Sequence, residues 1–187
     1  GEGGATILDL PSGALSYGKQ FIDVHQILAS KKLQLPDKHV RTFKEVTGRV
    51  RDLIKYRYGL ETLYPTTPRF FSRMEDKPAK TQHDEYWHEH IDARQYPGFE
   101  YTALIYLNDH GAEYKGGEFS FVDPPKEGGG DSKVFTTLRP ETGMLVAFTS
   151  GPENVHKVHR VTSGTRYALT VAFTCDETKA LKGVWVS

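Results

Sequence analysis

The chain has 187 residues, a length that suits one domain with a sizeable hydrophobic core. Its 24 basic and 24 acidic side chains give a formal net charge of zero, which offers no electrostatic argument for binding nucleic acid or an anionic membrane. Cys175 is the only cysteine, which excludes an intrachain disulfide and leaves the redox compartment open. No apolar run approaches the length of a membrane span. The chain starts at Gly1 without Met, so we expect a trimmed chain that could lack a signal or anchor.

The first third of the chain is predicted to be mainly helical. Residues 7–10 predict a short edge strand, and the apolar residues of 15–30 fit one face of a helix. Pro36 and Asp37 predict the start of a second helix, and Gly59 predicts its end. The apolar positions of this second helix recur at helical spacing: Val40, Phe43, Val46, Val50, Leu53 and Ile54. We therefore expect the second helix to pack over a sheet.

After Pro65 the pattern changes to short strands separated by Gly, Pro and Asp. The predicted strands are 69–74, 86–93, 100–108, 117–122, 133–139, 143–149, 155–162 and 165–174. Short strands at this spacing behind N-terminal helices predict a mainly β fold, a sandwich or jelly roll with helices on one side. We see no repeat and no second domain, and expect one domain over 1–187. The run Gly128–Gly130 is expected to be a flexible loop tip, with the hinge of a substrate lid as the alternative.

The candidate metal ligands are His90, Asp92 and His156. In a strand over 86–93, His90 and Asp92 stand two residues apart and point to the same face. His156 is the natural third ligand. Two histidines and one carboxylate on one face leave open positions on a metal, which is the arrangement of non-haem Fe(II) oxygenases.

Arg166 lies downstream of these residues, inside an apolar strand. A guanidinium pairs bidentately with a carboxylate, so Arg166 would suit a dicarboxylate co-substrate. His156 precedes a predicted turn at Ser163 and Gly164, and we expect a hairpin to bring Arg166 back towards the metal. The alternative is that Arg166 forms a structural pair with an Asp or Glu.

Other histidines near His90 leave a second interpretation open. His88 and His90 are also two residues apart, so this pair could form a zinc cluster with His83. That cluster would leave the carboxylate, the distal histidine and the arginine unexplained. His88 could instead orient a ligand or face the substrate. His159 is expected to point away from the metal on its strand.

Five motifs carry a family resemblance. They are His90-x-Asp92, YTALIYLN at 101–108, GGEFSF at 116–121, LRPxxG at 138–143 and HxVxxVxxGxR at 156–166. Together they resemble the prolyl hydroxylase group of Fe(II)/2-oxoglutarate dioxygenases. Residues 150–156 look like the collagen prolyl 3-hydroxylases. Segments 3–10, 12–16 and 83–88 extend the similarity over nearly the whole chain.

The resemblance implies a distorted double-stranded β-helix, the jelly roll of the 2-oxoglutarate oxygenases, with helical support over about 13–60 and a β-helix core over about 66–176. It assigns the three candidate ligands to Fe(II), and Arg166 to the distal carboxylate of 2-oxoglutarate. By motif position, the Tyr106 hydroxyl would contact the same carboxylate, and Thr170 would lie near the co-substrate. The alternative for Tyr106 and Thr170 is an ordinary role as buried sheet residues.

The implied function is a dioxygenase that hydroxylates a peptidyl substrate, with proline as the first candidate. The reaction would consume O2 and 2-oxoglutarate, release succinate and CO2, and depend on ascorbate. A small-molecule oxygenase and a non-catalytic peptide-binding module that keeps the metal site are the alternatives. No nucleic-acid partner is expected. The resemblance also implies a membrane-anchored or secretory-pathway protein, with any anchor in a segment missing from this chain.

Overall fold

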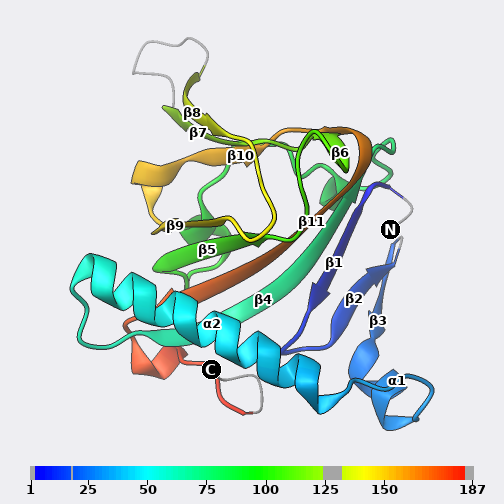
Figure 1. The fold of residues 1–187 in the computed structure, drawn as a ribbon, viewed down its shortest axis with the longest axis vertical. Helices are drawn as coiled ribbons and strands as arrows, with labels where there is room; N and C mark the ends of the chain where they lie inside the picture. Colours follow the sequence, from blue (N-terminus) through cyan, green and yellow to red (C-terminus); the bar gives the residue numbers. More distant parts are fainter. Residues whose placement is uncertain (1–2, 18, 124–131, 184–187) are drawn as a thin grey trace.

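The structure, a computed structural model, describes residues 3–17, 19–123 and 132–183, and these are mainly β (Figure 1). Gly128–Gly130 lie outside the described residues, so their interpretation as a loop tip or lid hinge stays a prediction. Within the described ranges, no helix combines the length and the apolar character that crossing a membrane requires.

The strands of the described residues form two antiparallel sheets. In spatial order, the main path of the large sheet is β3 (Gln20–Asp23), β2 (Ala14–Tyr17), β1 (Ala5–Asp9), β4 (Tyr64–Glu75), β11 (Val161–Thr174), β5 (Tyr101–Tyr106) and β9 (Leu145–Thr149). β6 (Tyr114–Gly116) joins this sheet by pairing with β11. The small sheet has the order β10 (His156–Val158), β7 (Phe119–Asp123) and β8 (Lys133–Leu138). Two such sheets are consistent with a jelly roll.

The described residues contain fewer helical segments than strands. The α-helices are α1 (Val24–Ala29), α2 (Asp37–Tyr58) and α3 (Asp92–Gln95), and the 3-10 helices are η1 (Gln82–Asp84), η2 (Pro152–Asn154) and η3 (Glu177–Lys179). α2 begins directly after Pro36 and ends at Gly59, the residues that predict its start and end. Gly59 adopts a left-handed conformation with φ of 66°, and its N–H donates to the Lys55 carbonyl, so a glycine closes the helix at little cost.

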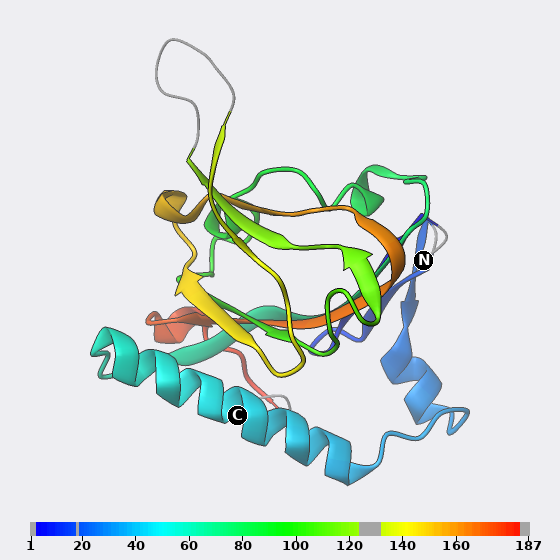
Figure 2. The same ribbon diagram turned by 45° about the horizontal axis from the view of Figure 1, so that its top comes forward.

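α2 lies along the outer face of the large sheet, away from the small sheet (Figures 1 and 2). Its buried apolar residues are Phe43, Val50 and Ile54, and they pack in one cluster with Leu169, Val171 and Phe173 of β11. Val46 is partly buried against the same cluster. Leu53, however, is 51% exposed, and Val40 is only partly buried and lies outside this cluster. The apolar periodicity therefore predicted a wider buried face than α2 has.

The predicted helix over 15–30 is wrong over its first half. Residues 14–17 and 20–23 are the paired strands β2 and β3, which extend the large sheet beyond β1. α1 begins only after Asp23, whose carboxylate accepts hydrogen bonds from the first turn of that helix. Cross-strand pairing has overridden a helical pattern that was too short to be decisive. β1 is consequently not an edge strand, because it pairs with both β2 and β4.

Two further strand predictions need correction. Residues 86–93 do not form a strand: His90 makes an isolated bridge with His156, and α3 begins at Asp92. The predicted hairpin at Ser163 and Gly164 is also wrong, because both residues lie inside β11. β10 pairs with β7, whereas the first part of β11 pairs with β6 through an irregular register. The backbones approach closely at Gly164, since a Cβ there would lie 2.2 Å from the carbonyl oxygen of Glu113, the residue before β6.

A second hydrophobic cluster draws residues from both sheets. Its buried members are Leu104, Tyr106, Phe119, Phe148, Val158 and Ala168. β11 links this cluster to the one beneath α2, because alternate residues of a strand point to opposite faces. Arg166 and Thr170 alternate with the residues beneath α2 and share the face of Ala168. The polar candidates of β11 therefore face the inter-sheet core.

Candidate metal centre

The structure brings His90, Asp92 and His156 together. Each offers one ligand atom, and these atoms lie within 4.8 Å of one another. The Nε2 atoms of His90 and His156 are 3.6 Å and 3.5 Å from the same Asp92 oxygen, Oδ1. The two imidazole rings are 4.3 Å apart, centre to centre. Three nitrogen and oxygen donors therefore converge on one point, the ligand set of a facial metal site.

A single pair of backbone hydrogen bonds positions the two histidines. The His90 N–H donates to the His156 carbonyl at 2.9 Å, and the His156 N–H donates back at 3.1 Å. Ile91 is extended, and Asp92 then opens α3, so the chain turns immediately after the bridge. The Ala93 N–H, bonded to the Ser150 carbonyl at 3.0 Å, holds that turn. The proximity of His90 and Asp92 was predicted, but it arises from a bridge and a turn rather than from a strand face.

Backbone carbonyls fix the tautomers of both histidines. Nδ1 of His90 lies 2.9 Å from the His88 carbonyl, and Nδ1 of His156 lies 2.8 Å from the Asn154 carbonyl. A carbonyl only accepts, so each Nδ1 carries the proton and each Nε2 keeps its lone pair for a metal. His88 orients His90 through its backbone, whereas its own exposed imidazole pairs with Glu85 at 2.8 Å. The side chain of His83 lies outside what the structure describes.

Asp92 is buried and held by a hydroxyl relay. The Thr102 hydroxyl donates to Asp92 Oδ2 at 2.6 Å, and the Ser150 hydroxyl lies 2.8 Å from Thr102 Oγ1. Burial favours a higher pKa for the Asp92 carboxyl, but neighbouring His156 and the Thr102 hydrogen bond outweigh it and hold that pKa below its usual value. Burial, with His156 nearby, lowers the pKa of the His90 imidazole. An ionised carboxylate and a neutral imidazole are the forms that bind metals.

An aromatic wall closes one side of the metal centre. The His156 ring stacks on Phe119 at 5.1 Å and meets Phe148 edge-on at 5.0 Å. Both phenylalanines belong to the inter-sheet cluster that also contains Tyr106. His156 is buried, whereas the His90 side chain keeps 25% exposure. The metal centre is therefore open to solvent on the His90 side.

Arg166 lies against the same inter-sheet cluster. It is 1% exposed, and its Nη1 contacts the Met74 sulfur at 3.5 Å. Its Nε and Nη2 atoms have no hydrogen-bond partner, so the alternative of a structural pair with an acid finds no support among the described acidic residues. The guanidinium lies 5.1 Å from the centre of the Tyr106 ring, and the buried Tyr106 hydroxyl also lacks a partner. A buried charge is costly unless paired, so this corner fits an anionic ligand.

Residues 72–174 match the 2OG-Fe(II) oxygenase superfamily. The chain belongs to that superfamily. Membership places the domain among the 2-oxoglutarate-dependent dioxygenases. The matched segment runs from β4 to the end of β11 and includes the three metal-ligand candidates and Arg166.

Relatives of the superfamily show how far the similarity extends. 2-Oxoglutarate and iron-dependent oxygenase domain-containing protein 3 of Xenopus tropicalis is 44% identical over 183 residues, covering 96% of this chain and 55% of that protein. Human prolyl 3-hydroxylase 2 is 29% identical over 163 residues, which cover 76% of this chain and 21% of that protein. A Trichoplax adhaerens prolyl hydroxylase, solved with a hypoxia inducible factor peptide fragment, has a TM-score of 0.51 at 24% identity. The match covers 72% of this chain and 56% of that structure's chain. The chain spans about half the length of the first relative.

Sequence reasoning missed Tyr114 of β6. Its hydroxyl is buried without a partner, and burial raises its pKa to about 12 although Arg166 acts in the opposite direction. Burial also raises the pKa of the Tyr106 hydroxyl. Nothing in the spacing of Tyr114 marks it, because an aromatic residue two positions before the Gly116–Gly117 pair could equally be a core residue. Only the register of β6 against β11 reveals its neighbours.

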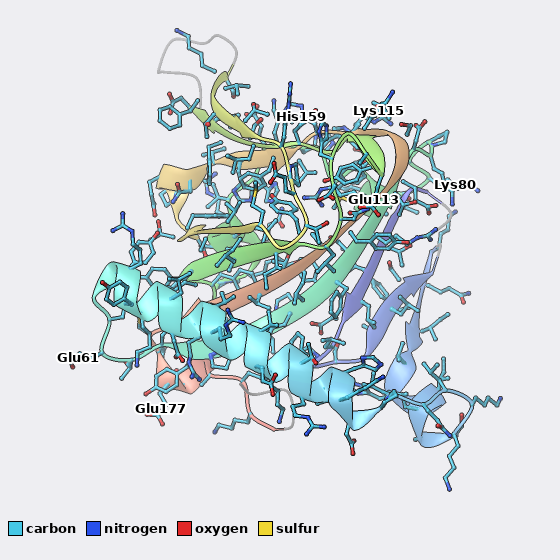
Figure 3. All side chains as sticks on the ribbon, viewed as in Figure 1. Glu61, Lys80, Glu113, Lys115, His159 and Glu177 are labelled. Carbon is cyan, nitrogen blue, oxygen red and sulfur yellow. The ribbon has the colours of Figure 1, made fainter. Side chains whose placement is uncertain are left out.

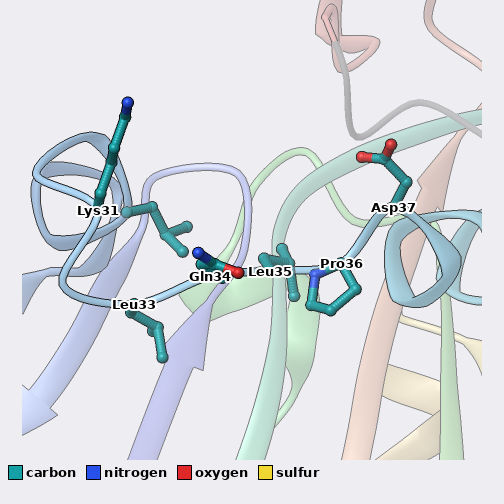
Figure 4. Close-up of a pocket in the computed structure, with 7 residues that line it drawn as sticks. Lys31, Leu33, Gln34, Leu35, Pro36 and Asp37 are labelled. Carbon is teal, nitrogen blue, oxygen red and sulfur yellow. The ribbon is translucent and has the colours of Figure 1, made fainter.

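The other candidates have less distinctive surroundings. Thr170 is buried and pairs in register with Leu104 and Phe70, which fits either a sheet residue or a pocket wall. His159 is not part of the metal group, and its Nε2 lies 2.8 Å from the Ser120 hydroxyl beside the small sheet (Figure 3). A surface hollow lined mainly by the segment between α1 and α2, including Leu33, contains no site residue (Figure 4).

Proposed function

We propose that this domain is an Fe(II)- and 2-oxoglutarate-dependent dioxygenase that hydroxylates a peptidyl residue, with proline as the first candidate. One observation carries the proposal: a His–Asp–His donor set and a buried guanidinium with two unpaired N–H groups border the same inter-sheet cluster. The donor set suits Fe(II), and the guanidinium suits a carboxylate. A purely structural core would have no use for either group.

In this proposal, Fe(II) is held by His90 Nε2, Asp92 Oδ1 and His156 Nε2. When bound, iron supplies the oxidising chemistry that couples O2 and 2-oxoglutarate consumption to C–H hydroxylation, with succinate and CO2 released. The chain's own groups keep the three ligand atoms available to the metal. The carbonyls behind the imidazoles hold both Nε2 atoms unprotonated, and Thr102 keeps Asp92 Oδ2 occupied so that Oδ1 remains available. Phe119 and Phe148 exclude water from the His156 side.

Arg166 would bind the distal carboxylate of 2-oxoglutarate, with Tyr106 beside it. The two unpaired nitrogens of Arg166 can bind a carboxylate bidentately, which fixes its orientation as well as its charge. Gly117 leaves room for this arginine, because a Cβ there would lie 2.9 Å from Arg166 Cδ. Thr170 would line the same pocket from β11.

A peptide is the proposed substrate because human prolyl 3-hydroxylase 2 shares 29% identity with three quarters of the chain. Ascorbate would sustain turnover. We also propose that 1–187 acts as one domain, with helical support within about 13–60 and the β core over about 66–176.

The test is a screen of proline-containing peptides with Fe(II), 2-oxoglutarate and ascorbate. The proposal expects a peptide that gains the mass of one oxygen atom, in step with succinate release, and loss of both signals in the Asp92→Ala variant. Oxygen gain confined to small molecules would assign the domain to small-molecule oxidation instead. Metal binding and peptide binding without succinate release would identify a non-catalytic module.

A further inference from the structure

Four buried polar atoms without hydrogen-bond partners gather in the Arg166 corner. They are Nε and Nη2 of Arg166, the Tyr106 hydroxyl and the Tyr114 hydroxyl. Buried polar groups in native proteins are almost always paired, so a cluster of unpaired donors indicates a ligand that completes it. The arginine and Tyr106 already have a place in the proposed function, but Tyr114 does not.

The strand register places Tyr114 beside Arg166. Tyr114 opens β6 and pairs with Gly164 of β11, two residues before Arg166 (Figure 1). A Cβ on Gly117 would lie 2.9 Å from Arg166 Cδ and 3.2 Å from Tyr114 Cε2, so both side chains flank the same point. Tyr114 is 2% exposed, which means that water does not satisfy its hydroxyl from the surface.

We propose that Tyr114 is a further binding residue for 2-oxoglutarate, whose hydroxyl donates a hydrogen bond to the distal carboxylate held by Arg166. The inference rests on the proposed function and adds to it a residue that the family motifs do not mark. The four unpaired donors match the roughly four lone-pair positions of one carboxylate. The corner would thus select co-substrates with a second, ionised carboxylate.

The protonation state of Tyr114 agrees with a donor role. Burial raises its pKa to about 12, so the hydroxyl keeps its proton at neutral pH and donates to an anion. Packing of the ring alone does not explain why residue 114 carries a hydroxyl. The Tyr114 ring meets His110 edge-on at 5.7 Å, but His110 Nε2 is already engaged by Glu118 at 2.9 Å. Phenylalanine would make the same ring contacts without burying an unpaired hydroxyl.

The experiment compares two ligands on Mn(II)-loaded protein by calorimetry. 2-Oxoglutarate has the distal carboxylate, and 2-oxobutyrate lacks it. Tyr114→Phe should weaken 2-oxoglutarate binding about 10-fold, the loss expected for one hydrogen bond to a charged group, and should leave 2-oxobutyrate binding unchanged. Tyr167→Phe is the matched control, because Tyr167 adjoins Arg166 on β11 but is 40% exposed. Tyr167→Phe should bind both ligands as the parent does.

Thermal unfolding without ligand supplies a second readout. Removing an unpaired buried hydroxyl should leave the melting temperature of Tyr114→Phe unchanged or raise it. A lower melting temperature would reveal a structural partner for the hydroxyl and overturn the inference. If Tyr114→Phe weakened binding of both ligands equally, or bound 2-oxoglutarate with parental affinity, the role of Tyr114 would be overturned. The proposed function would still stand. Failure of the parent protein to bind 2-oxoglutarate would instead overturn the proposed function, and the inference with it.

Discussion

Replacement of Arg166 by methionine tests the co-substrate corner most informatively. Methionine keeps an unbranched, apolar side chain next to Met74, and removes the charge and both donors that lack a partner. Because no described acid pairs with Arg166, its removal leaves no buried carboxylate without a partner. Breaking a buried ion pair usually lowers the free energy of unfolding by about 3–5 kcal/mol. The ligand-free Arg166→Met variant should not show this loss.

The cost should instead appear in ligand binding. Losing the charged partner of a buried carboxylate costs roughly 2–5 kcal/mol, which corresponds to a rise in the 2-oxoglutarate dissociation constant of about 30-fold or more. Arg166→Lys should recover only part of that affinity, because an ammonium group cannot reproduce the planar, bidentate geometry. Mn(II) affinity should be unchanged in both variants, since Arg166 contributes no atom to the metal group.

Titration calorimetry of 2-oxoglutarate into Mn(II)-loaded protein measures both constants. Arg160→Met is the matched control: Arg160 is exposed and stacks on Trp87 at 3.9 Å, outside the Arg166 corner. This control should bind 2-oxoglutarate as the parent does. Parental affinity in Arg166→Met, or a large loss in Arg160→Met, would refute the assignment and move the anchor to another basic residue.

Three further predictions concern the metal centre and the fold. His156→Ala should abolish retention of Fe(II) or Mn(II), as measured by elemental analysis of the purified protein. Thr102→Val should weaken metal binding by roughly 10- to 100-fold, because Asp92 Oδ2 loses its only side-chain donor within the described residues; unchanged affinity would show that Thr102 does not position the carboxylate. Phe43→Ala should cost about 3–5 kcal/mol in denaturant unfolding, whereas exposed Leu53→Ala should cost under about 0.5 kcal/mol.

The sequence predicted the proximity of the three metal-ligand candidates better than the path of the chain that brings them together. The three metal-ligand candidates converge as expected, yet the premise of a strand over 86–93 is wrong. Ligand identity depends on which residue types can bind a metal, and this can be read from a sequence. The isolated bridge between His90 and His156 depends on a contact between distant segments, and no local pattern encodes it.

Long-range pairing also explains the other errors. The helical pattern over 15–30 gave way to strands because β1 offered a free edge to β2, and β2 in turn pairs with β3. Gly164 was expected in a tight turn, but β6 packs against it inside a continuous strand. Tyr114 was missed for the same reason, since its neighbours come from another strand. Periodicity succeeded for α2, whose caps and long apolar face are local features.

A crystal structure of the protein with Mn(II) and 2-oxoglutarate tests the central claim most directly. The account predicts anomalous density for one metal bound by His90 Nε2, Asp92 Oδ1 and His156 Nε2. It also predicts the distal carboxylate of 2-oxoglutarate against Arg166, within hydrogen-bond distance of Tyr106. A metal bound by other residues, or 2-oxoglutarate bound away from Arg166, would contradict it.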